Sequence, residues 1–243
     1  MDSRIKVYSL LAVLTLACSI VFADGDSRKP TPAEKEFGQT VFNVIAKALP
    51  PGPEGWEKAG KTEDTELKVI YTDVNKPLRI EYYLAWQDSK RMQEAQTQLN
   101  QEMMKLLPKP GASMAQITEM QKKIEELQKN AEPQDVKARI DLYTNISSQG
   151  LYDKAKPGAA VAGGLVYRTD GKYVNGGWRE GSTFVFFGGN WKLAGNYVNF
   201  TPEKTATSST VIQNIVVKIQ ADPKRAAQFI QKMDWQALKG LIK

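Results

Sequence analysis

Residues 55–62 read GWEKAGKT, which fits the phosphate-binding loop pattern G-x-x-x-x-G-K-[ST] at every fixed position. In nucleotide-binding proteins a buried strand leads into this loop and a helix begins at its Lys-Ser/Thr, so that backbone amides and the lysine meet the phosphates. Here a proline-rich segment precedes the motif, acidic Glu63 and Asp64 follow it, and the next residues have the composition of a strand. We therefore interpret the motif as a surface loop and predict that the protein binds no nucleotide and no cofactor.

The residue types of the chain exclude several other catalytic mechanisms. The chain has no histidine, and its one cysteine is Cys18, close to the N-terminus. Ser-His-Asp catalysis, Cys-His catalysis and zinc sites built from His or Cys are therefore excluded. Paired carboxylates remain, as in glycoside hydrolysis, and Asp141, Asp170 and Glu180 lie in or near expected strands. A carboxylate-dependent hydrolase of cell-wall or storage polymers is the alternative function, although no residue is assigned a catalytic or metal-binding role.

Methionines concentrate between about residues 88 and 132, where five of the seven in the chain lie. They could fill a seam between two helices, form an adaptable apolar surface for a partner, or bind Cu(I) through their thioethers. Filling of the seam is the preferred interpretation. The candidate partner surface consists of Met92, Met103, Met104, Ile117 and Met120.

Aromatic side chains gather among glycines in the second half of the chain. They could stack on sugar rings, but glycine beside aromatics also suits sharply twisted antiparallel strands, which is the interpretation we favour. The residues are Tyr173, Trp178, Trp191, Tyr197 and Phe200.

The first 23 residues have the pattern of a cleaved signal peptide. Arg4 and Lys6 precede an apolar run over residues 10–22, and cleavage is expected between Ala23 and Asp24. This run would reach about 20 Å as a helix, short of the roughly 30 Å hydrocarbon core of a bilayer. We expect a periplasmic protein without a transmembrane span in its mature chain. A lipid anchor on Cys18 is the alternative.

Charge and cysteine usage narrow the expected partners. Basic residues outnumber acidic ones by 33 to 27, and neither sign forms a long block, which is typical of a solvated surface. A mature chain without cysteine can form no disulfide, which favours the bacterial periplasm over a eukaryotic secreted scaffold. Outside the cytoplasm the anionic neighbours are envelope lipids and polymers. We expect an envelope protein or an anionic cell-envelope polymer as the partner, and no nucleic acid.

Hydrophobic periodicity predicts one α+β domain over residues 31–243, preceded by a polar tether at 24–30. A helix is expected from a capping box at Thr31 to about Leu49, and two more begin after Asp222 and Asp234. Alternating apolar patterns predict an antiparallel sheet of roughly five to seven strands. These patterns cover residues 66–73, 78–86, 136–147, 214–222 and several short segments between 158 and 200.

Two further expectations concern how these elements connect. Residues at about 88–132 carry Met, Leu and Ile at helical spacing, which predicts an inserted antiparallel helical hairpin with an apolar seam like that of a coiled coil. Residues 182–187 and 191–200, on either side of Gly188-Gly189-Asn190, predict a β-hairpin.

Short motifs lie at both ends of the expected domain. A P-x-G-W sequence follows the first helix, and an Asp-apolar-x-x-Leu-x-x-Leu sequence ends the chain. The residues are Pro53, Gly55 and Trp56, then Asp234, Trp235, Leu238 and Leu241. This order resembles small exported bacterial proteins of uncharacterised function, although the helical segment at 88–132 is longer here. The resemblance implies export and carries no activity with it.

We predict that residues 1–30 fused to a reporter active only outside the cytoplasm will export that reporter. N-terminal sequencing of the exported protein should begin at Asp24, because signal peptidase reads the small side chain of Ala23. An intact Met1 in the envelope fraction would contradict the prediction.

Overall fold

The computed structural model describes residues 28–59, 67–71, 73, 75–107, 113–131, 134–151, 154–174 and 177–243. The expected signal peptide with Cys18, Ala23 and Asp24 lies outside the described residues, as do residues 60–66, which include the Lys-Thr of the phosphate-loop motif. Among the described residues, no helix has both the length and the apolar character needed to cross a bilayer.

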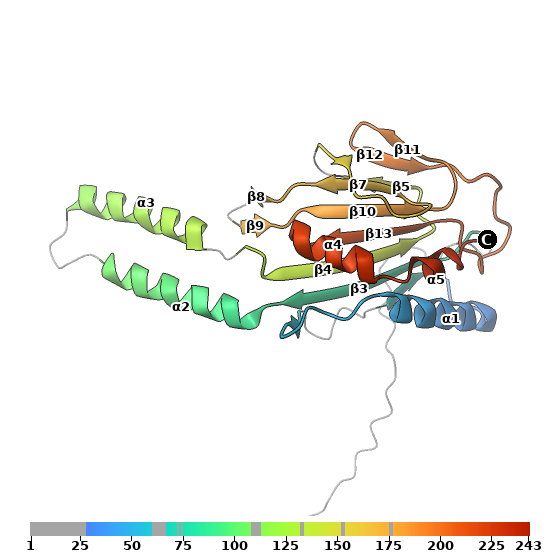
Figure 1. Cartoon of the computed structure of the whole chain (residues 1–243), viewed down its shortest axis with the longest axis horizontal. Helices are drawn as coiled ribbons and strands as arrows, with labels where there is room; N and C mark the ends of the chain where they lie inside the picture. Colours follow the sequence, from blue (N-terminus) through green and yellow to red (C-terminus); the bar gives the residue numbers. More distant parts are fainter. Residues whose placement is uncertain are drawn as a thin grey trace, which may run out of the picture.

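The chain folds as an α+β structure around a large antiparallel sheet (Figure 1). Eight strands form this sheet: β1 (Glu57–Lys58), β2 (Leu67–Ile70), β3 (Arg79–Gln87), β4 (Lys137–Thr144), β6 (Lys156–Pro157), β7 (Leu165–Thr169), β10 (Ser182–Phe187) and β13 (Ile215–Gln220). Their order is β1-β3-β4-β13-β10-β7-β6, and β2 also pairs with β3. The predicted α+β class with an antiparallel sheet is confirmed. The main sheet has one strand more than expected, because strands as short as β1 and β6 leave no alternating pattern.

Two smaller antiparallel sheets and five helices complete the described structure. β5 (Ser148–Gly150), β11 (Trp191–Ala194) and β12 (Tyr197–Phe200) form one small sheet, and β8 (Lys172–Val174) pairs with β9 (Gly177–Arg179). The helices are α1 (Pro32–Ala48), α2 (Ser89–Lys105), α3 (Met114–Ala131), α4 (Pro223–Lys232) and α5 (Trp235–Lys239).

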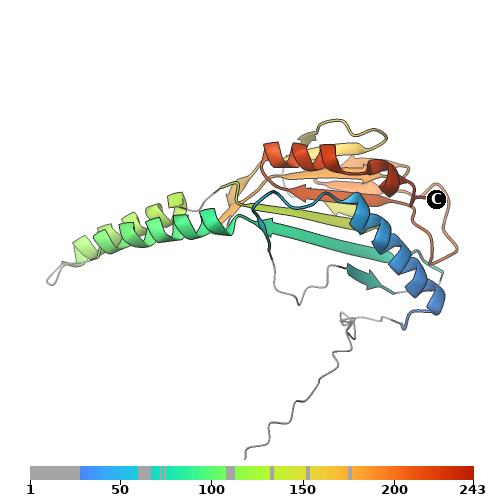
Figure 2. The same ribbon diagram turned by 60° about the horizontal axis from the view of Figure 1, so that its bottom comes forward.

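One face of the main sheet is apolar, and α1, α4 and α5 cover it (Figure 2). Alternate residues of the central strands point to this face, as the period of two in a strand requires. They pack against α1 through Val41 and Ile45, against α4 through Phe229 and against α5 through Leu238. Burying each such side chain contributes about 1.5–3 kcal/mol. The sheet residues in this core include Ile80, Tyr82, Ile140, Leu142, Val185, Val217 and Ile219.

Capping residues in the sequence fix where these helices begin. At the start of α1, the Glu34 amide donates to Thr31 Oγ1 over 3.2 Å, and the Thr31 amide donates to Glu34 Oε2 over 2.8 Å. This is the predicted capping box. Asp222 caps α4 and Asp234 caps α5, each by accepting hydrogen bonds from backbone amides in the first turn.

The predicted hairpin between residues 182–187 and 191–200 is wrong. β10 pairs with β13 on one side and β7 on the other, so neither of its edges is left for β11. The chain leaves the sheet at Gly188, whose φ of 90° favours glycine and whose position leaves no room for a Cβ beside the Gln213 carbonyl. β11 and β12 pair instead with each other around Gly195, at φ 60°.

The second face of the main sheet is covered in part by the small sheet of β5, β11 and β12. Val198 and Trp191 pack there against Phe184, Phe186 and Val216. Over β3 and β4 the same face carries polar and charged side chains. The main sheet therefore has one largely apolar face, and a second face that is apolar over β10 and polar over β3 and β4.

Helices α2 and α3 lie side by side and project from one end of the main sheet, between β3 and β4 in the chain (Figure 1). We call them the helix pair. α2 contains no buried residue, and the side chains of Met92, Met103, Ile117 and Met120 are half-buried. Residues 108–112, where the predicted hairpin turn falls, lie outside the described residues.

We predict that replacing residues 90–132 by a short Gly/Ser linker will leave a cooperative fold. β3 and β4 pair directly over seven residue pairs, from Glu81–Tyr143 to Gln87–Lys137, and closing a surface loop between them costs little entropy. Urea denaturation followed by tryptophan fluorescence measures the outcome. A variant that loses its unfolding transition would show that the helix pair belongs to the main core.

Candidate functional site

A cluster of charged and phenolic side chains lies on the second face of the sheet, over β3, β4 and β13. We call Glu81, Tyr83, Arg139, Asp141 and Lys218 the polar cluster. They meet because β4 pairs with both neighbours in register: Asp141 lies opposite Tyr83 on β3 and opposite Lys218 on β13. Directly opposite residues have Cβ atoms about 4.5–5.5 Å apart, which is within reach of these long side chains.

Both carboxylates of the polar cluster are buried and paired. Asp141 accepts a hydrogen bond from Arg139 Nε, and Lys218 Nζ lies 3.6 Å from its Oδ2. Glu81 Oε1 lies 2.7 Å from an Arg79 guanidinium nitrogen, and Glu81 also accepts a hydrogen bond from the Tyr83 hydroxyl. A buried carboxylate without such partners would be strongly destabilising. Burial, and then the hydrogen bond to Glu81, raise the pKa of Tyr83, so this phenol stays protonated.

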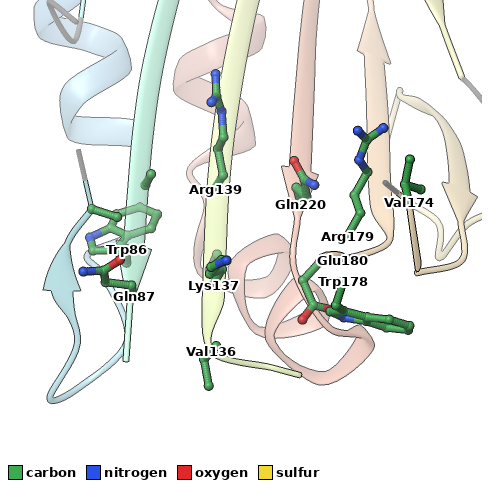
Figure 3. A pocket seen from close by; sticks show the side chains of 13 residues that line it. Trp86, Gln87, Val136, Lys137, Arg139, Val174, Trp178, Arg179, Glu180 and Gln220 are labelled. Carbon is green, nitrogen blue, oxygen red and sulfur yellow. The ribbon is translucent and has the colours of Figure 1, made fainter. Parts of the chain in front are cut away.

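Next to the polar cluster, at the end of the sheet from which the helix pair projects, lies a pocket of about 460 Å³ (Figure 3). We call it the basal pocket. Its volume falls within the range of about 300–1,000 Å³ typical of small-molecule sites. The lining residues come from four places: the end of β1 and β3 (Ala59, Ala85, Trp86, Gln87), β4 and the residue before it (Val136, Lys137, Ala138, Arg139), the β8–β9 hairpin with the residue after it (Val174, Trp178, Arg179, Glu180), and Gln220 of β13.

Three side chains form a polar row across the pocket. Arg139 of β4 lies directly opposite Gln220 of β13, and Figure 3 shows Arg179 beyond Gln220 in the same row. The Arg139 Nε–H is bonded to Asp141, and its guanidinium lies over the Tyr83 ring at 5.2 Å. No ion pair joins the Arg179 guanidinium to a residue that the structure describes, and the Gln220 side-chain amide likewise has no hydrogen bond to the described residues. Donors of two arginines and one amide thus face a common space.

Glu180 forms a buried wall of the pocket and connects it to the root of the helix pair. Its Oε1 accepts a hydrogen bond of 2.8 Å from the amide of Asp135, which has a left-handed φ of 59°. Arg91 of α2 in turn donates to the carbonyls of Gln134 and Asp135. Burial raises the pKa of Glu180, and the Asp135 hydrogen bond opposes this. Glu180 is therefore a structural acceptor that fixes the turn between α3 and β4.

The three carboxylates considered for hydrolysis do not form one site. Asp141 lies in the polar cluster, paired with Arg139 and Lys218. Asp170 is exposed and pairs with Lys156 over 2.8 Å. Glu180 alone of the three lines the basal pocket. Among the described residues, no group of three or more His, Cys, Asp or Glu side chains is arranged to hold a metal ion.

The other residues singled out in the sequence divide between packing and surface. Trp191 packs between Phe186 and Phe200, with both pairs of ring centroids 5.0 Å apart, whereas Tyr197 is 57% exposed. Trp178 lines the basal pocket, with Tyr173 against its ring at 5.4 Å.

Within the candidate partner surface the helix pair shields all but one residue. Met92, Met103, Ile117 and Met120 are half-buried, and Met104 is 71% exposed. The exposed side chains Met104, Leu107 and Met114 all lie where α2 ends and α3 begins.

The described part of the phosphate-loop motif forms a turn and a strand. The Trp56 amide donates to the Pro53 carbonyl over 3.1 Å, with Gly55 at φ 75°, and Glu57 and Lys58 then pair with β3. The Trp56 ring packs against the main core, and the Arg225 guanidinium carbon lies over it, 4.3 Å from the ring centroid. This segment is attached to the edge of the sheet.

Comparisons of the chain with protein-family models, with curated proteins and with solved structures find no match. The resemblance of the two ends of the domain to small exported proteins therefore stays an expectation.

We predict opposite results for two substitutions of Glu180. Glu180→Gln keeps an acceptor for the Asp135 amide. Glu180→Ala removes the acceptor of this half-buried hydrogen bond and should lower the free energy of unfolding by about 1 kcal/mol. Because burial raises the pKa of Glu180, the stability it contributes is complete below about pH 4.3, the ordinary value, and is lost as the pH rises through the folded pKa.

Glu180→Gln should therefore gain stability relative to the wild type between pH 4 and pH 7, measured by urea denaturation at several pH values. A stability difference that does not change with pH, or that changes in the opposite direction, would contradict this assignment.

Proposed function

We propose that this protein is an exported, non-enzymatic binding module of the bacterial envelope, and that its ligand binds in the basal pocket. The observation that carries the proposal is the row of Arg139, Gln220 and Arg179. These side chains direct hydrogen-bond donors into a pocket of about 460 Å³, and those of Arg179 and Gln220 make no hydrogen bond to the described residues. Convergent polar groups in a well-formed pocket are the usual mark of a binding site.

The charge of the pocket supports an anionic envelope polymer as the partner. Lys137, Arg139 and Arg179 line it together with one carboxylate, Glu180. Export, which the N-terminal 23 residues predict, would place this surface beside lipopolysaccharide and cell-wall polymers. The helix pair, whose exposed Met104, Leu107 and Met114 lie at one end, would leave the pocket accessible while contacting a second envelope component.

A hydrolase is the less favoured function. Hydrolysis of a glycosidic bond needs two carboxyl groups on either side of the bond. Glu180 is the one carboxylate lining the described pocket, and it holds the Asp135 amide. The polymer should therefore leave the pocket uncut.

The test is a pocket-filling substitution that changes no charge. Ala85→Phe places an aromatic ring in the basal pocket, and Ala194→Phe places the same ring on exposed β11 as the matched control. Purified wild type and the Ala194→Phe variant should bind isolated anionic envelope polymers, with a rise in melting temperature that grows with polymer concentration. Ala85→Phe should lose at least tenfold in affinity.

Equal binding by all three proteins would contradict the pocket assignment. Release of new reducing ends from the bound polymer would show that the protein hydrolyses it, and would contradict the non-enzymatic role.

A further inference from the structure

We propose that the row of Arg139, Gln220 and Arg179 binds a phosphate or carboxylate group carried on a sugar ring, the ring lying against Trp178 and Val174. This inference rests on the proposed function and names the chemical class of the ligand at the same pocket.

The residue types of the row suit an oxyanion. A guanidinium presents its N–H groups in a fixed planar fork that matches carboxylate and phosphate oxygens, and Arg139 has its two terminal nitrogens left for this purpose because only Nε donates to Asp141. Gln220 lies directly opposite Arg139, and Arg179 lies on its other side, so an anion above Gln220 meets a donor from each of three neighbouring segments (Figure 3).

The polar cluster holds Arg139 in place before any ligand arrives. Asp141 is almost wholly buried and takes both Arg139 and Lys218 as partners. The Tyr83 ring lies beneath the guanidinium at 5.2 Å. A cation fixed by a carboxylate and an aromatic face loses little side-chain entropy when it binds an anion. Arg139 therefore provides the fixed side of the site, and exposed Arg179 provides the adjustable side.

The apolar wall indicates what carries the anion. Trp178 and Val174 line the pocket on the side of the β8–β9 hairpin. Tyr173 packs edge-on against Trp178 and supports it. An aromatic side chain beside hydrogen-bond donors suits a sugar ring, which has apolar C–H faces and polar edges. A free phosphate ion would use the arginines and leave this wall without a contact.

The experiment measures binding of four probes to the purified protein by calorimetry at low ionic strength: galacturonic acid, glucose 6-phosphate, glucose and inorganic phosphate. The two sugar acids should bind, glucose should not bind at the same concentration, and inorganic phosphate should bind at least tenfold more weakly than glucose 6-phosphate. Raising the salt concentration should weaken binding of both sugar acids, because the attraction is between charges.

Single substitutions test which residues contribute to binding. Arg179→Gln should weaken binding of the sugar acids about tenfold, as expected for loss of one charge-assisted contact. Trp178→Ala should weaken binding of glucose 6-phosphate but leave that of inorganic phosphate unchanged. The control is Lys192→Gln, which removes the same charge from exposed β11 and should leave every affinity unchanged. Arg139→Gln is less informative, because it removes an ion-pair partner of buried Asp141 and so lowers stability as well as binding.

Other outcomes would each contradict a different part of the proposal. Equal affinity for inorganic phosphate and glucose 6-phosphate would show that the sugar ring contributes nothing to binding. Binding to phosphatidylglycerol vesicles without binding to either sugar acid would assign the site to a lipid headgroup and overturn it. If no small anion binds while the envelope polymer still binds and Ala85→Phe abolishes that binding, the oxyanion inference fails and the proposed function stands. If Ala85→Phe has no effect on the polymer, the pocket assignment itself fails.

Discussion

The register between β4 and β13 decides where the charges of this protein lie. In this register Ile140 and Leu142 of β4 and Val217 and Ile219 of β13 share the face that the helices cover. Arg139, Asp141 and Lys218 then fall on the opposite face. A slip of β4 by one residue would turn Arg139 and Asp141 into the apolar core and turn Ile140 and Leu142 outward. Since burial of the helix-covered face is the largest stabilising contribution, the hydrophobic pattern fixes the position of the polar cluster.

The polar cluster in turn explains why the basal pocket is positively charged. Asp141 is buried beneath the side chains that pair with it, and its desolvation is offset by Arg139 and Lys218. Those cations are arranged to satisfy Asp141, yet an arginine has five N–H donors and Asp141 takes one of those of Arg139. Arg139 also lines the basal pocket. In the proposed site, structural pairing and anion binding would use different atoms of one guanidinium.

Local signals in the sequence were enough to predict most of the elements. The capping box of Thr31 and Glu34, the caps at Asp222 and Asp234, and the alternation along β4 and β13 all depend on residues close together in the chain. The pairing of β10 could not be predicted in the same way. Its partners are β7 and β13, while the glycine-rich segment that follows it looks like a tight hairpin, and only the competition for the two edges of β10 decides between them.

The basal pocket could not be predicted because none of its determinants is local. Arg139, Arg179 and Gln220 come from three separate segments, and no local pattern in the sequence brings them together. Trp178 and Glu180 were recognised as an aromatic and a carboxylate of interest, but their places in one wall depend on the β8–β9 hairpin lying at the end of the sheet. The methionines show the converse. Their helical spacing predicted packing, and four of the five residues named there are half-buried.

The central claim is that two arginines hold one anion, and the most direct measurement is NMR of the arginine side chains during a titration with glucose 6-phosphate. The Nε–Hε resonances of Arg139 and Arg179 should shift together and saturate at the same ligand concentration, while that of Arg91, which binds backbone carbonyls at the root of α2, should stay in place. Shifts confined to other arginines, or a shift of Arg179 without one of Arg139, would contradict the account.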